Sequence, residues 1–194
     1  MAIQYLLPHV PLEDMRLAPV GARSAPLFTF GLLTLACTLA SFAFACATPF
    51  AAFAVIAAGI LPPSSALLVM LATCVANQVI GFGALHYPVD GNTIFWGITI
   101  GAAALAGTVA AASMLRLARN ANTTAALGLA LVAAFGAYES VLFATSLFLG
   151  SEGAFSAGVV GRIGVLNILW LIGLVVTSET VRLLNPNQRN QLAS

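Results

Sequence analysis

Two ionisable residues, Glu139 and Arg162, stand in apolar stretches that are long enough to cross a lipid bilayer. A charged side chain inside a membrane is costly, so such residues are candidates for function by default. An arginine guanidinium binds a carboxylate or a similar anion, and a carboxylate accepts hydrogen bonds from the groups around it. The chemistry that these two residue types predict is recognition of a small polar or anionic molecule.

Other polar side chains fall at the same depth. At a rise of about 1.5 Å per residue, Glu139 lies about 15 Å and Arg162 about 10 Å below the outer ends of their predicted helices. Three amides and two aromatic residues elsewhere in the chain reach this level or lie near it. The predicted substrate-binding residues are Asn77, Gln78, Trp96, Tyr138, Glu139, Arg162 and Asn167. The amides would supply hydrogen bonds, and Trp96 or Tyr138 would stack on a ring of the ligand.

A structural interpretation of the same residues stays open. Glu139 and Arg162 would then form an ion pair that holds two helices together, with the amides hydrogen-bonding between helices. The sequence alone does not decide whether the two charged groups pair with each other or with a ligand.

Several kinds of chemistry are absent from the sequence. All seven basic residues are arginine, which excludes lysine-based covalent chemistry and the P-loop lysine. There is no HExxH, GxSxG or glycine-rich phosphate loop, and no pair of carboxylates within the apolar stretches. His86 has no second ligand at metal-binding spacing, and the net charge of +1 shows no nucleic-acid footprint. We therefore expect a protein that is not an enzyme and has no cofactor, metal site or nucleic-acid partner.

The elements that would position these residues are membrane-spanning helices. The chain is 60% hydrophobic and 7% charged, and Asp90 is the single charged residue between Arg23 and Arg116. A soluble domain does not leave so long a stretch uncharged. Proline, glycine, asparagine and charged residues divide the chain into apolar segments. The predicted helices are residues 27–47, 50–61, 64–85, 93–115, 123–149 and 155–184.

The predicted fold is an all-α integral membrane protein with a bundle of six transmembrane helices. Residues 1–25, broken by three prolines, form an arm that is cytoplasmic or lies at the membrane surface. Residues 26–185 form the transmembrane domain, and residues 186–194 form a cytoplasmic tail. With six crossings, every arginine except Arg162 falls on the cytoplasmic side, as the positive-inside rule requires. Both termini are therefore expected in the cytoplasm of a cell whose inner membrane holds the protein.

Small residues recur on one face of the first predicted helix, at Ala36, Ala40, Ala43 and Ala47. Such stripes let helix backbones approach closely, which is how helices associate in lipid. The stripe indicates either packing inside the bundle or a docking face for a partner subunit. The two interpretations differ in what a bulky substitution would do.

The six-helix pattern, the polar layer in the outer half and the run from Ala36 to Ala40 together resemble the substrate-binding S-component of energy-coupling factor transporters for vitamins and metals. The resemblance covers residues 27–184 by architecture. It implies a substrate-capture subunit for a vitamin-like molecule that docks on membrane partners, including a coupling subunit with ATPases. The cobalt and nickel type begins with a metal-binding histidine near the N-terminus, where this chain has Ala2 and Ile3. The alternative function is an accessory or assembly subunit of a larger membrane complex, with Glu139 and Arg162 as a structural pair.

Overall fold

The structure is a computed structural model that describes residues 16–44, 48–149 and 155–185, and all regular secondary structure in these ranges is helical. The predicted all-helical fold is confirmed. When the π-helix is counted with the helix that it continues, five of the six predicted helices begin and end within two residues of the observed ones. The elements are α1 (Ala25–Phe44), α2 (Phe50–Ile60), α3 (Pro63–Val79), the π-helix η2 (Ile80–Ala84), α4 (Gly91–Leu117), α5 (Thr123–Leu149) and α6 (Ala157–Leu184).

Five helices are long and apolar enough to cross a membrane: α1, α3 continued by η2, α4, α5 and α6. The chain is therefore a multi-pass membrane protein. Helix α2 has 11 residues, which span roughly 16 Å, about half of the ~30 Å hydrocarbon core. It is too short to cross by itself, so six complete crossings and the cytoplasmic position of both termini stay predictions.

Helix α2 forms the centre of the bundle. All of its residues except Ala58 are buried, and it packs against each of the other five α-helices. Its sequence consists of alanine, glycine and large apolar residues, so it is apolar on every side, as a helix surrounded by other helices must be. Because lipid tails are as apolar as these side chains, close packing rather than water exclusion holds the helices together here.

Proline and polar caps set the ends of the central elements. Pro49 precedes α2, and Pro63 occupies the first turn of α3, where its missing N–H costs no hydrogen bond. Asp90 caps α4 by accepting hydrogen bonds from the Thr93 backbone N–H at 2.8 Å and from its hydroxyl at 3.1 Å. These residues were the signals by which the sequence predicted the helix boundaries.

The last part of the predicted arm packs onto the bundle. The Leu17 N–H donates to the Gly59 carbonyl at the end of α2, and the Leu17 side chain is buried. Arg16 donates to the carbonyl oxygens of Ala118 and Ala121, at 2.6 and 2.8 Å, where α4 ends. Residues 16 and 17 therefore fix one end of the bundle, and residues 1–15 lie outside the described part of the chain.

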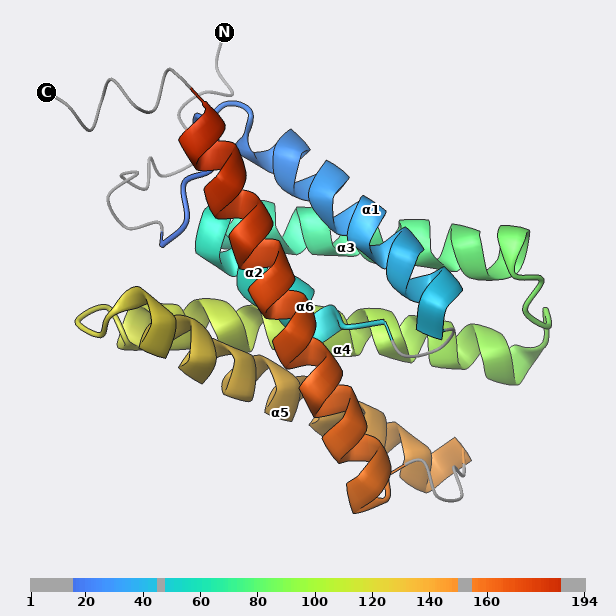
Figure 1. Cartoon of the computed structure of the whole chain (residues 1–194). Helices are drawn as coiled ribbons and strands as arrows, with labels where there is room; N and C mark the ends of the chain where they lie inside the picture. The colour runs from blue at the N-terminus through green and yellow to red at the C-terminus, as the bar shows by residue number, and fades with distance from the viewer. Residues whose placement is uncertain (1–15, 45–47, 150–154, 186–194) are drawn as a thin grey trace, which may run out of the picture.

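Helices α1 and α3 run in the same direction, because the short α2 between them leads the chain back toward the end at which α1 begins (Figure 1). The helices from α3 to α6 alternate in direction, and α6 crosses the others obliquely. Helices α4 and α5 approach closely because Gly107 has no side chain: a Cβ there would lie 3.2 Å from the Ala134 carbonyl oxygen. By contrast, no Cα atoms of α1 and α6 come within 8 Å of each other in the described ranges. The start of α1 and the end of α6 lie at the same end of the bundle (Figure 1), which we call the arginine end; the other we call the outer end.

Candidate functional site

Glu139 lies on the side of α5 that faces α6. It is one helical turn from Phe135 and one turn from Phe143, so the three side chains share one face of the helix. A Cβ placed at Gly164 of α6 would lie 3.7 Å from the Phe135 ring, and the rings of Phe143 and Phe155 meet edge to face with centroids 5.4 Å apart. Glu139 thus lies between two contacts of α5, one with α6 and one with Phe155 just before α6.

The Glu139 carboxyl is incompletely satisfied. Its Oε1 atom is buried and has no hydrogen-bond partner, although the side chain as a whole is only partly buried. A buried acceptor without a donor loses its interactions with water and gains nothing in return. A hydrogen-bond donor from outside the chain would therefore satisfy the Oε1 atom of Glu139.

The predicted ion pair between Glu139 and Arg162 is not formed. The single ion pair within the described ranges joins Arg182 to Glu179, at 2.6 Å. Arg162 is exposed and lies two residues before Gly164, so the two positions point about 160° apart around a helix of 3.6 residues per turn. Because Gly164 faces α5, Arg162 projects from the opposite side of α6, away from Glu139, although both residues lie at similar depth.

Asn77 of α3 joins α3 to α1 and to the segment before α2. Its Oδ1 atom accepts hydrogen bonds from the Cys37 thiol at 3.2 Å, the Ser41 hydroxyl at 3.1 Å and the Thr48 hydroxyl at 3.5 Å. Interhelical hydrogen bonds of this kind stabilise helix association in membranes. The oxygen of Asn77 is thus already engaged within the protein.

Gln78, the next residue, joins α3 to α4. Its side-chain amide donates to the Gly97 carbonyl at 3.4 Å, and a Cβ at Gly97 would come within 2.7 Å of the Gln78 Oε1 atom. A side chain at position 97 would therefore require the Gln78 amide to move. Trp96 precedes Gly97 on α4 and is only partly buried.

Asn167 of α6 caps the buried N-terminus of α2. Its Oδ1 atom accepts a hydrogen bond from the Ala52 N–H at 2.9 Å, and its amide donates to the Ile163 carbonyl at 3.0 Å. The first N–H groups of a helix have no partner within the helix, so an oxygen that accepts a hydrogen bond from one of them removes the cost of burying that group. Tyr138 of α5 is buried beside Phe50, with ring centroids 6.2 Å apart.

The amides of the predicted polar layer make contacts in different parts of the bundle, and the substrate-binding role of the layer stays a prediction. Asn77, Gln78 and Asn167 use their side chains to hold different pairs of elements together, as the structural interpretation expected of the amides. Glu139 and Arg162 face different sides of α6. Of the predicted binding residues, these two are the charged groups that the described contacts leave without a partner.

A groove that the sequence analysis did not predict lies between α1 and α6. It has a volume of about 450 Å³ and is apolar apart from Thr177. Its lining residues are Leu32, Leu35, Ala36, Leu39, Leu166, Leu169, Trp170, Gly173, Leu174 and Thr177. Trp170 also packs edge to face on Phe53 of α2, with centroids 6.2 Å apart. Trp170 in mid-helix, with Gly173 three residues later, is the sequence signal from which this region could have been predicted.

The alanine stripe of α1 divides between the interior and the surface. Ala36 and Ala40 are buried within the bundle, Ala43 is exposed, and Ala47 lies outside the described residues. Burial of the first two supports the packing interpretation for them. A docking role stays a prediction for Ala43.

Within the described ranges, no group of three or more histidine, cysteine, aspartate or glutamate side chains is arranged to hold a metal ion. Comparison of the chain with protein-family models, with curated proteins and with solved structures finds no match.

Proposed function

We propose that the chain is a membrane-embedded, non-enzymatic subunit that captures a small polar molecule, and that Glu139 is the residue that contacts this molecule. The observation that carries the proposal is the buried Oε1 atom of Glu139, which has no hydrogen-bond partner. A carboxyl group within a membrane-spanning helix needs a partner, and Arg162 does not supply one.

The position of Glu139 narrows the class of ligand. A carboxylate or carboxyl oxygen accepts hydrogen bonds, so the matching molecule presents an N–H or O–H group or a positive charge. Arg162 projects from the other side of α6 and takes no part in this contact. The ligand thus differs from the purely anionic molecule that pairing with Arg162 would favour.

Coupling to partner subunits, which the resemblance to S-components implies, belongs to the same proposal. The surface available for it is α6, in which 17% of the most apolar stretch is buried, against 33% or more in the other four long helices. This exposure also favours the second candidate function, an accessory subunit of a larger membrane complex. Without the Glu139–Arg162 pair, that candidate depends on the exposed surface of α6 and on the exposed Ala43 of α1.

The test compares Glu139→Gln with the parent protein. Purified protein is screened by thermal shift against small cationic and zwitterionic molecules, and molecules that co-purify with it are identified by mass spectrometry. We expect Glu139→Gln to weaken binding of the identified molecule about tenfold or more, because a charge-assisted hydrogen bond contributes about 1.5–3 kcal/mol.

Glu179→Gln is the matched control. It makes the same chemical change in a helix, but Glu179 lies at the arginine end, where it pairs with Arg182. This variant should bind the molecule as the parent does. Equal binding by Glu139→Gln and the parent would remove Glu139 from the site and leave the accessory function as the better explanation.

A further inference from the structure

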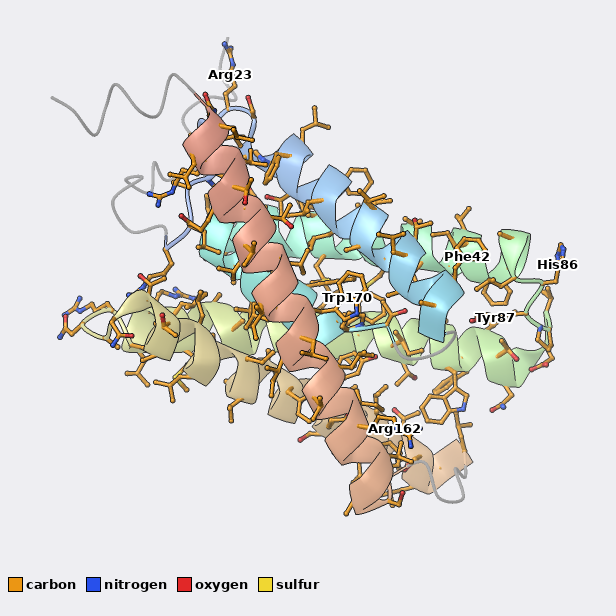
Figure 2. The ribbon with its side chains drawn as sticks, in the orientation of Figure 1. Arg23, Phe42, His86, Tyr87, Arg162 and Trp170 are labelled. Carbon is orange, nitrogen blue, oxygen red and sulfur yellow. The ribbon has the colours of Figure 1, made fainter. Side chains whose placement is uncertain are left out.

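Arg162 lies on the same face of α6 as the groove. Leu166, Leu169, Trp170 and Gly173 follow it at intervals of four, seven, eight and eleven residues, which places all five side-chain positions on one side of a helix. The last four of these residues line the groove. Figure 2 shows Arg162 and Trp170 on the same side of α6, with Arg162 toward the outer end.

The depth of Arg162 matches the level of lipid headgroups. Helix α6 has 28 residues and is roughly 42 Å long, about 12 Å more than the ~30 Å hydrocarbon core. Arg162 is five residues from the start of α6, or about 7.5 Å along its axis. If the excess length is shared between both ends, Arg162 lies at the edge of the hydrocarbon, where a long cationic side chain extends to the polar interface.

The groove begins one turn below Arg162 and continues inward. Its lining on α6 runs from Leu166 to Thr177, a rise of roughly 16 Å that begins below the outer edge of the hydrocarbon and extends past the middle of the bilayer. The walls are leucine side chains of α1 and α6, and no close contact between these two helices closes the gap. The groove has the length and the apolar lining that an acyl chain requires.

The charge at the outer end of the groove has no ion-pair partner among the described residues. No carboxylate oxygen of the described residues lies within 4.0 Å of the Arg162 guanidinium, whereas Arg182, near the other end of α6, pairs with Glu179. A guanidinium binds phosphate oxygens in bidentate geometry. An apolar groove with a free cation above it complements a molecule with an acyl chain and a phosphate.

We propose that the groove between α1 and α6 binds one glycerophospholipid from the leaflet at the outer end, with its phosphate on Arg162 and an acyl chain along Leu166, Trp170 and Gly173. This site lies on the opposite side of α6 from Glu139. It does not depend on the proposed function.

The test uses native mass spectrometry of delipidated protein titrated with phosphatidylglycerol and with diacylglycerol of the same acyl chains. The parent protein should bind the phospholipid more tightly than the diacylglycerol. Arg162→Gln should lose about tenfold in phospholipid affinity and should no longer distinguish the two lipids, whereas Arg162→Lys should keep part of the preference. Arg119→Gln removes an exposed charge at the arginine end and should leave both affinities unchanged.

A second, independent experiment fills the groove with a larger side chain. A Cβ at Gly173 has no heavy atom within 4 Å, so Gly173→Leu projects into the groove without a backbone clash and should abolish binding of both lipids. Gly161→Leu makes the same change at an equally open glycine of α6 that lies off the groove face, and should bind as the parent does. Circular dichroism of each variant verifies that the helices are retained.

Three results would overturn the proposal. The first is unchanged phospholipid binding by folded Arg162→Gln or Gly173→Leu. The second is displacement of the lipid by inorganic phosphate at equal concentration, which would show that the acyl chain contributes nothing. The third is a lipid-free dimer of the parent protein that Gly173→Leu converts to monomer, which would assign the groove to a second copy of the chain.

Discussion

At the scale of single residues, the stability of the protein is expected to depend on pH through Asp90, which lies outside the membrane-spanning segments. The backbone N–H of Thr93 holds the pKa of the Asp90 carboxyl below its ordinary value of 3.8. The folded chain therefore favours the carboxylate. The contribution of this cap to stability is present above the unfolded pKa and is lost as the pH falls through the folded pKa.

We predict that Asp90→Ala lowers the melting temperature of the purified protein at neutral pH and has a smaller effect well below pH 3.8, the ordinary pKa. Asp90→Asn keeps a side-chain oxygen that caps the helix equally well and does not titrate. It should show the neutral-pH stability of the parent and a weaker loss in acid. Thermal unfolding of the three proteins across this pH range tests the prediction, and identical acid profiles for parent and Asp90→Asn would contradict it.

At the scale of elements, the packing of α1 depends on small residues at its interior face. Ala40 is completely buried, whereas Ala43, three residues later on the same helix, is exposed. We predict that Ala40→Leu overpacks the interior and lowers the free energy of unfolding by about 1–3 kcal/mol. Ala43→Leu adds the same atoms at the surface and should leave the stability of the subunit nearly unchanged.

The measurement is thermal or denaturant unfolding of both variants in the same detergent, combined with a pull-down of membrane partners. A stable Ala40→Leu would contradict the interior position of this alanine. Loss of a co-purifying subunit from Ala43→Leu, with unchanged stability, would give the exposed end of the stripe the docking role that the sequence analysis considered.

At the scale of the whole molecule, the orientation of the bundle can be tested directly. Arg16 contacts the end of α4, and the start of α1 lies at the same end of the bundle as the end of α6 (Figure 1). Arg23, Arg116, Arg119 and Arg182 belong to segments at that end, so the positive-inside rule places it in the cytoplasm. Val89, in the connection between η2 and α4, then faces outward and is 79% exposed.

We predict that Val89→Cys reacts with a membrane-impermeant maleimide in intact cells, and that Asn120→Cys reacts only after permeabilisation. Both changes are made in a chain whose native cysteines have been replaced, and terminal epitope tags should behave like Asn120→Cys. The reverse labelling pattern would show that the bundle has the opposite orientation in the membrane. Tags on opposite sides of the membrane would contradict the position of the start of α1 and the end of α6 at one end of the bundle.

The sequence by itself determined the class of the protein and the places where its helices begin and end. The charge-free stretch between Arg23 and Arg116 requires lipid surroundings, and that property depends on composition alone. Pro49, Pro63 and Asp90 act on their own neighbours within one turn, so their effects could be predicted without knowledge of the fold. Depth within the membrane was also predictable, since it follows from the number of residues between a side chain and the helix end.

Only the tertiary structure decided which way each side chain faces. Glu139 and Arg162 share a depth, but the crossing of α5 and α6 at Phe135 and Gly164 fixes the rotation of α6 and turns Arg162 toward the groove. Likewise, Asn167 caps α2 because that short helix begins inside the bundle beside α6. Rotation about a helix axis depends on which neighbour each side packs against, and those neighbours are far away in the sequence.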